Sequence, residues 1–197
     1  MRILAECKDA QKIGISGHIR PDGDCIGSCL ALYQYLKKCL SSDVEVTVYL
    51  EKPAPIFDKM AGFEYIVNDY PDVESMDVFF VLDCNLERLG DGAKYFDIAK
   101  KRINIDHHIS NTGCGNINYV IPTIGSTSEI IYDLIVAENG EEILDKDLAE
   151  AIYTGIIHDT GVFQYSNTTP KTMEIGAKLI NYGFDFPKLI EETFYQR

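Results

Sequence analysis

The stretch Asp77-Val78-Phe79-Phe80-Val81-Leu82-Asp83 decides the fold of this 197-residue chain. An unbroken apolar run between two acidic residues is typical of a strand buried on both faces. Lys101–Asp106 has a similar pattern. Strands of this kind occur in parallel sheets that are covered by helices on both sides. The two runs therefore predict such a sheet.

The remaining chain alternates in the same way. Further strands are expected at 12–18 and 44–50, and helices at about 24–40, 126–139, 146–158 and 169–182, with a short helical segment from Pro187. Thr169-Pro170 is typical of a helix start, because threonine caps well and proline suits the first helical position. The chain has no internal repeat. We expect one α/β domain, residues 1–197, with a mostly parallel β-sheet flanked by helices on both faces.

The chain is acidic, with a net charge of -13 and a pI of about 4.6. This argues against broad binding of long nucleic acid, which needs a basic face. A small phosphate ester or a very short oligonucleotide is still allowed, because bound cations can reverse the local field. A hydrophobic content of 46% is that of a folded protein and not of a disordered one.

The 6 cysteines form no C-x-x-C pair and are expected to be free thiols of a reducing compartment. The N-terminus lacks an apolar signal core, and no apolar run is long enough to cross a membrane. We expect a cytoplasmic protein with no membrane partner.

Polar residues gather where the predicted strands end. His18, Asp83 and Asp106 each stand at the carboxyl end of a predicted strand. In parallel sheets these ends meet at the edge where ligands bind. All 4 histidines of the chain also lie in acidic clusters: His18 with Asp22 and Asp24, Asp106-His107-His108, and His158-Asp159. The sequence therefore predicts one polar site at this edge.

Carboxylates and imidazoles suit Mn²⁺, Mg²⁺ or Zn²⁺, whereas a structural zinc site would favour paired cysteines. The clusters hold too many carboxylates for one small cation, since unpaired carboxylates in one place repel each other. Two divalent ions held about 3.5–4 Å apart resolve this, with one carboxylate shared between them. Asp83, alone at a buried strand end, suits the shared position.

Each cluster also has a structural interpretation. Asp22-Gly23-Asp24 could be only a turn with a helix cap, and Asp83 could cap the segment at 85–89. His158 is expected on the helix surface or behind the ligands, and Asp159 is the better ligand. Ser126 and Ser128 lack a nucleophile-elbow pattern, and Cys84 lacks a basic environment. The chain contains neither the G-x-x-x-x-G-K-[ST] loop nor the G-x-G-x-x-G pattern of nucleotide-binding proteins.

The clusters together resemble the DHH phosphoesterase family. The resemblance rests on four ordered motifs: His18-Ile19-Arg20-Pro21-Asp22-Gly23-Asp24, Val81-Leu82-Asp83, Asp106-His107-His108, and Gly155 to Phe163. It is greatest for the branch of bifunctional oligoribonucleases and 3′-phosphoadenosine-5′-phosphate phosphatases, with which the chain shares Gly125-Ser126-Thr127-Ser128-Glu129. Family II inorganic pyrophosphatases share the metal motifs and are the nearest alternative.

The resemblance implies a Rossmann-like fold and two Mn²⁺ ions, for which Mg²⁺ or Co²⁺ could substitute. One ion would be held by His18, Asp22 and Asp83, and the other by Asp24, Asp83, His107 and Asp159. Asp106 would orient its neighbours, and His108 would contact the scissile phosphate. Arg20 and Arg88 could meet substrate phosphates or be ordinary surface arginines.

The expected activity is metal-dependent hydrolysis of phosphate esters in short oligoribonucleotides or nucleoside 3′,5′-bisphosphates. A pyrophosphatase, or a non-catalytic metal- and nucleotide-binding module, is the alternative. The resemblance also implies a second, C-terminal domain with a glycine-rich basic motif. Residues 1–197 contain no such motif, so we expect this chain to be the metal-binding half, weakly active or inactive alone. The oligomeric state stays open, with a homodimer as the assembly considered.

Overall fold

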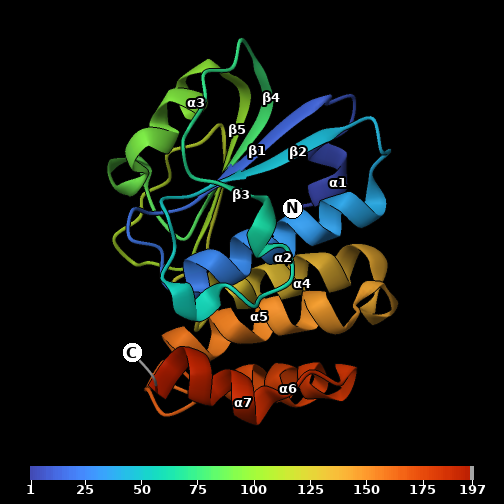
Figure 1. Ribbon diagram of the computed structural model, residues 1–197, viewed down its shortest axis with the longest axis vertical. Helices are drawn as coiled ribbons and strands as arrows, with labels where there is room; N and C mark the ends of the chain where they lie inside the picture. Colours follow the sequence, from blue (N-terminus) through green and yellow to red (C-terminus); the bar gives the residue numbers. More distant parts are fainter. Residues whose placement is uncertain (196–197) are drawn as a thin grey trace.

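The computed structural model describes residues 1–195 and has a six-stranded sheet at its centre, in the order β3-β2-β1-β4-β5-β6 (Figure 1). The strands are β1 (Lys12–Ser16), β2 (Glu45–Tyr49), β3 (Ile66–Val67), β4 (Met76–Leu82), β5 (Ala99–Asp106) and β6 (Ile117–Val120). All neighbouring strands are parallel. The predicted α/β class with a parallel sheet is therefore confirmed.

Strand β4 lies between β1 and β5, and its composition follows from that place. Val78, Phe80 and Leu82 belong to the larger core on one face of the sheet. Phe79 and Val81 belong to a second core on the opposite face. Because alternate residues of a strand point to opposite faces, a strand covered on both sides must be apolar throughout.

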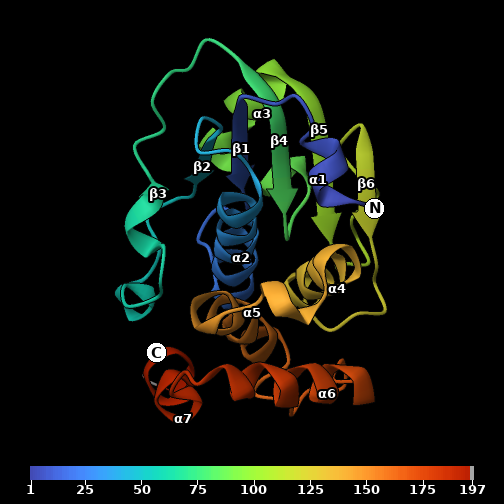
Figure 2. The ribbon, with the colours of Figure 1, turned by 90° about the vertical axis from the view of Figure 1, so that its right-hand side faces the viewer.

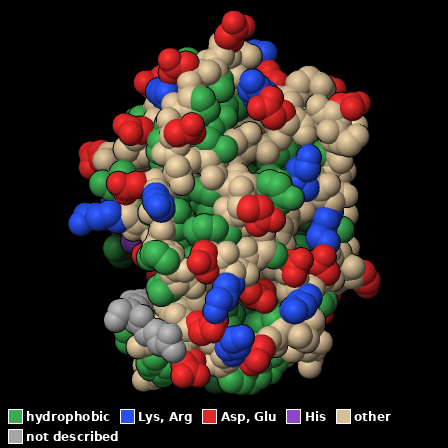
Figure 3. Space-filling view, in the orientation of Figure 1, with side chains coloured by type: hydrophobic (Ala, Val, Ile, Leu, Met, Phe, Trp, Pro, Cys, Tyr) green, Lys and Arg blue, Asp and Glu red, His purple; other side chains and the backbone are tan. Residues whose placement is uncertain are grey.

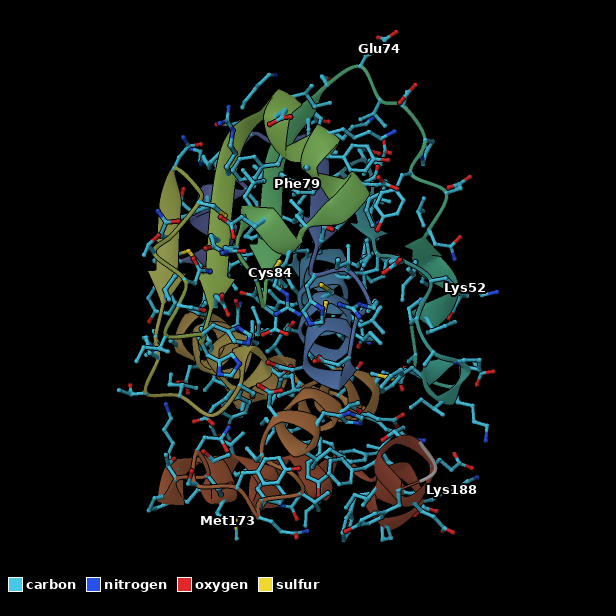
Figure 4. All side chains as sticks on the ribbon, turned by 90° about the vertical axis from the view of Figure 1, so that its left-hand side faces the viewer. Lys52, Glu74, Phe79, Cys84, Met173 and Lys188 are labelled. Carbon is cyan, nitrogen blue, oxygen red and sulfur yellow. The ribbon has the colours of Figure 1, made fainter. Side chains whose placement is uncertain are left out.

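Helices cover the two faces unequally. One face is packed by α1 (Ile3–Glu6), α2 (Gly23–Cys39), α4 (Thr127–Asn139) and α5 (Lys146–Asp159). The opposite face carries α3 (Ala93–Ile98), the side on which Figure 4 labels Phe79. The ring centroids of Tyr95 and Phe79 are 6.0 Å apart. Helices α6 (Pro170–Leu179) and α7 (Phe186–Ile190) form an outer layer beyond α5 (Figure 2).

The helices begin where capping residues predict. Asp22, Ser126, Asp145 and Thr169 each accept a hydrogen bond from a backbone N–H of the first turn. Short 3₁₀ turns complete the chain: η1 (Pro55–Phe57), η2 (Phe63–Tyr65), η3 (Leu86–Arg88), η4 (Gly90–Gly92), η5 (Glu141–Ile143) and η6 (Ile180–Tyr182). A π-helical turn, η7 (Glu191–Tyr195), follows α7.

The structure departs from the sequence prediction at several boundaries. β1 ends at Ser16 and not at His18. The next residue, Gly17, already packs closely against α2, because a Cβ there would lie 2.3 Å from the Cys25 sulfur. The short elements α1, α3, β3 and β6 were not predicted. All six cysteines are free. Among residues 1–195, no helix combines the length and hydropathy needed to cross a bilayer.

Candidate metal centre

The carboxyl edge of the sheet brings the predicted ligands together. Figure 4 shows this edge at the labelled Cys84, directly after β4, where the sheet meets helices α2 and α5. Side-chain nitrogen and oxygen atoms from separate segments lie within 4.0 Å of a neighbour in this cluster: His18, Asp22, Asp24, Asp83, His107, His108, Asp106 and Asp159.

Asp83 is the centre of the cluster. Its side chain is 2% exposed, and its backbone adopts a left-handed φ of 61° that turns the carboxylate out of the strand direction. Oδ2 lies 3.4 Å from His18 Nε2, and Oδ1 lies 3.6 Å from His107 Nε2. Thr127 Oγ1 donates a hydrogen bond of 2.9 Å to Oδ1. The capping interpretation of Asp83 is wrong, because no side chain caps the following turn η3.

His18 is oriented as a ligand. Its Nδ1–H donates to the carbonyl of Ile19 at 2.9 Å, so Nε2 faces Asp22 Oδ2 at 3.6 Å. A backbone hydrogen bond of this kind fixes the tautomer in metal-binding histidines. Burial lowers the pKa of His18, but the carboxylates of Asp22 and Asp83 outweigh it and raise the pKa to about 11.

Asp22 caps a helix and also faces His18. Its Oδ1 caps α2 by accepting from the N–H groups of Asp24 and Cys25, while Oδ2 faces His18. Burial raises its pKa, but His18 and the cap donors lower the pKa to about 2. The carboxylate is therefore ionised and fixed in direction.

His107 forms the second group. Its Nε2 lies 2.7 Å from Asp159 Oδ2 and 4.0 Å from Asp24 Oδ2, while Nδ1 faces the carbonyl of Ile124 at 3.3 Å. Although Asp159 Oδ2 is close enough for an ion pair, this buried nitrogen makes no hydrogen bond. An orphaned buried ring nitrogen that faces two carboxylates fits a shared divalent cation.

Asp24 is completely buried where α4 begins. Its two oxygens accept from the backbone N–H groups of Thr127 at 2.6 Å and Ser128 at 2.9 Å. Burial raises its pKa well above the usual range, and the charges of Asp83 and Asp159 raise it further. Such a group of buried carboxylates calls for a cation to neutralise it.

Asp106 holds His108 in place. Its Oδ1 accepts from the backbone N–H groups of His107 and His108 and from His108 Nδ1, which lies 2.7 Å away. Its Oδ2 accepts from Asn111 Nδ2 at 2.5 Å. Asp106 raises the pKa of His108, and burial opposes this more weakly. His108 is 38% exposed and can meet a ligand.

The two predicted substrate arginines are placed differently. Arg88 lines a small pocket of about 40 Å³ beside His108. Arg20 is exposed, does not line this pocket, and donates its backbone N–H to the Glu51 carboxylate. Arg88 is thus the better placed of the two.

Some residues that support the site were not predicted from the sequence. Asn104 and Asn111 form a buried amide network that supports Asp106 and the carbonyl of Cys84. Placing His158 on the helix surface was wrong, because it is 7% exposed and its ring packs against Gly23, where a Cβ would lie 2.1 Å from the ring. A signal for this was the glycine between Asp22 and Asp24, which leaves room for the ring.

Known proteins are similar in sequence to this chain over most of its length. The "Bifunctional oligoribonuclease and PAP phosphatase NrnA" of Thermus thermophilus is 32% identical, over 100% of this chain and 58% of its own length. A "Probable bifunctional oligoribonuclease and PAP phosphatase NrnA" of Streptococcus mutans is 34% identical, over 96% and 59%. A "Probable manganese-dependent inorganic pyrophosphatase" of Streptococcus agalactiae is 27% identical, over 90% and 60%.

Solved structures agree with the sequence comparison. An exopolyphosphatase-related protein from Bacteroides fragilis superposes with a TM-score of 0.88 at 29% identity, covering 98% of this chain and 59% of that one. This chain therefore spans somewhat more than half the length of the relatives it matches. Residues 12–156 match the DHH family, N-terminal domain, and the chain belongs to that family.

Proposed function

We propose that this chain is the metal-binding part of a phosphoesterase that hydrolyses short oligoribonucleotides or 3′-phosphoadenosine-5′-phosphate with two Mn²⁺ ions. The observation that carries the proposal is Asp83, whose two oxygens face histidines from different segments. The names of the NrnA relatives, which describe oligoribonucleases and PAP phosphatases, support the substrate class. The free cysteines agree with a cytoplasmic location.

The donor set divides into two groups around Asp83. His18 and Asp22 offer Nε2 and a carboxylate oxygen on one side. His107, Asp24 and Asp159 offer the same kinds of atom on the other. Nitrogen and oxygen donors without thiolate pairs suit Mn²⁺ or Mg²⁺. Bound at these positions, divalent ions would lower the pKa of water and neutralise phosphate oxygens.

Asp106, His108 and Arg88 would position the substrate and supply a proton. Asp106 accepts from His108 Nδ1, which raises the pKa of the ring and keeps a proton available. In its protonated form, His108 would donate a hydrogen bond to a phosphate oxygen or a proton to the leaving oxygen. Arg88 lies on the same pocket wall and adds a positive charge for a flanking phosphate.

The test is Mn²⁺-dependent release of mononucleotides from a dinucleotide. It is run on this chain and on a form extended past Arg197 along its natural reading frame. Turnover that requires Mn²⁺ and is lost in His108→Ala is expected from the extended form. If the extended form binds Mn²⁺ but leaves dinucleotide and 3′-phosphoadenosine-5′-phosphate intact, the proposed activity is rejected.

Pyrophosphate hydrolysis is the second candidate, since a pyrophosphatase relative also aligns over 90% of the chain. Pyrophosphate carries no nucleoside, so a direct comparison of the two substrates separates the candidates. We expect the dinucleotide to be preferred, because the relatives with higher identity are oligoribonucleases by name.

A further inference from the structure

An apolar pocket opens beside the metal centre, at the end marked by Asp22. It has a volume of about 370 Å³, and Ala54, Ile56, Phe57 and His158 form its walls. In Figure 1 the short turns of residues 55–65 lie against the beginning of α2, where this pocket is found. The volume falls in the range of small-molecule sites, which begins at about 300 Å³.

The pocket is continuous with the centre through one carboxylate. Asp22 lines the pocket, and its Oδ2 lies 3.6 Å from His18 Nε2. His18 reaches Asp83 at 3.4 Å, and Asp83 Oδ1 lies 3.7 Å from His108 Nδ1. A row of neighbouring side chains thus joins the pocket to His108 through Asp22, His18 and Asp83.

The two ends of this row differ in size and polarity. The pocket at His108 measures about 40 Å³, too little for an aromatic ring but enough for a water or a phosphate oxygen. The pocket at Asp22 is roughly nine times larger and mainly apolar. Of these two pockets, only the one at Asp22 is large enough for the ring of a ligand whose phosphate lies at the centre.

The wall of the larger pocket is already formed. Phe57 is 3% exposed, and its ring centroid lies 5.2 Å from that of His158 at an interplanar angle of 53°. His158 is fixed in turn by Thr193 Oγ1 at 3.2 Å and by the ring of Phe194. Ala54 is exposed and Ile56 is half-buried, so they stand at the mouth. A planar ring can enter without rearrangement of the core.

We propose that this pocket is the subsite for one nucleobase of the substrate, an inference that rests on the proposed function. An apolar lining contacts the faces of a base and offers few polar groups to read its edge. Stacking of this kind tolerates every base. The subsite would therefore distinguish nucleotides from base-free phosphates, while adenine and guanine would bind alike.

The experiment compares adenosine 5′-monophosphate with ribose 5-phosphate, both in the presence of Mn²⁺, by calorimetric titration of the chain. Wild type is expected to bind the nucleotide about tenfold more tightly than the sugar phosphate. Ala54→Trp fills the mouth of the pocket and should bring this ratio close to one. Ile56→Ala should reduce the ratio as well, while Ile98→Ala, the same change on the remote helix α3, should keep it.

The titrations can reject the base subsite in two ways. Equal affinities in wild type, or a ratio unchanged in both Ala54→Trp and Ile56→Ala, would overturn the base subsite and leave the proposed function standing. If neither ligand binds in Mn²⁺, the base subsite is rejected, while the dinucleotide assay on the extended form still decides the proposed function. Ala54 is exposed, so its replacement does not require the core to repack.

Discussion

At the scale of single residues, Asp83 connects the two halves of the centre. Each of its oxygens faces a different histidine, and its backbone adopts a left-handed φ of 61°. We predict that Asp83→Ala abolishes binding of both Mn²⁺ ions, because each ion loses its shared ligand. Metal content after equilibration and calorimetric titration measure this directly.

The matched control is Asp97→Ala, an exposed aspartate on α3. It removes the same charge from the surface and should leave two ions bound. An Asp83→Ala protein that folds and still binds two ions would show that the shared-ligand assignment is wrong.

The pKa values of the two histidines that face Asp83 lead us to predict that Mn²⁺ affinity depends on pH. In the metal-free protein, carboxylates outweigh burial and raise the pKa of His18 to about 11 and of His107 to about 10. Both rings are therefore protonated at neutral pH, and a proton must leave each before Nε2 can bind a metal. Mn²⁺ affinity should rise with pH, by up to about tenfold per unit and per histidine.

Calorimetry between pH 6.5 and 8 in buffers of different ionisation enthalpy counts the protons released. His18→Gln should release fewer protons than wild type, because one titrating ring is gone. Binding that releases no proton, with an affinity independent of pH, would contradict the protonated metal-free state.

The sequence predicted these residues because each follows a strand or stands in an acidic cluster. Nothing in the sequence singled out Asn104 and Asn111, since an asparagine in a strand or a loop carries no periodic signal. Their role arises only when β5 and its following loop meet the end of β4, where their amides reach Asp106 and Cys84. Tertiary contacts of this kind lie beyond single-sequence patterns.

At the scale of elements, the crossing of α2 and α5 positions the acidic ligands. A Cβ at Gly27 would lie 2.5 Å from the carbonyl oxygen of Ala151, and one at Gly155 would lie 1.8 Å from Ser128 Oγ and 2.6 Å from Asp24 Oδ1. We predict that Gly27→Ala destabilises the fold by about 1–3 kcal/mol, because backbone of α5 must move away. Mn²⁺ affinity should fall as well, since α5 carries Asp159.

Urea unfolding with and without Mn²⁺ measures both effects. Gly176→Ala is the matched control, since its Cβ would meet only the end of the Phe163 ring, 2.7 Å away, which can turn aside. That variant should be neutral or slightly stabilising, because alanine favours a helix. Equal stability of Gly27→Ala and wild type would mean that the helices do not need this close approach.

The long elements could be predicted and the short ones could not. β4 and α2 have strong apolar patterns, and their boundaries differ from the expectation by about one residue. β3 has two residues and β6 has four, so neither is long enough to show a pattern. Both are edge strands that pair with only one neighbour, and the sheet beside them decides their conformation.

At the scale of the whole molecule, the charge distribution limits the partners. The face in Figure 3 shows acidic and basic side chains intermixed, without a continuous basic stripe, and the net charge is -13. We predict that an RNA of about 20 nucleotides binds no more tightly than a dinucleotide. Its affinity should change less than about tenfold between roughly 50 and 200 mM salt.

Fluorescence anisotropy at the two salt concentrations provides the measurement. A protein that neutralises many phosphates loses several orders of magnitude in affinity over this range. A steep salt dependence would therefore contradict the prediction and reveal an extended basic surface outside the face in Figure 3.

The metal centre also links the layers of the molecule. The proposed ligands follow β1 and β4, stand at or after the end of β5, and lie at the start of α2 and the end of α5, so ions bound there would hold the sheet to the helices. A ligand of the folded state at about 100 times its Kd adds about 2.7 kcal/mol for each site. For a chain of this length we predict that saturating Mn²⁺ raises Tm by roughly 5–10 °C per ion. Calorimetric scans with Mn²⁺ and with a chelator test this; Asp97→Ala should show the full shift, and a shift of the same size in Asp83→Ala would mean that Mn²⁺ stabilises the fold elsewhere.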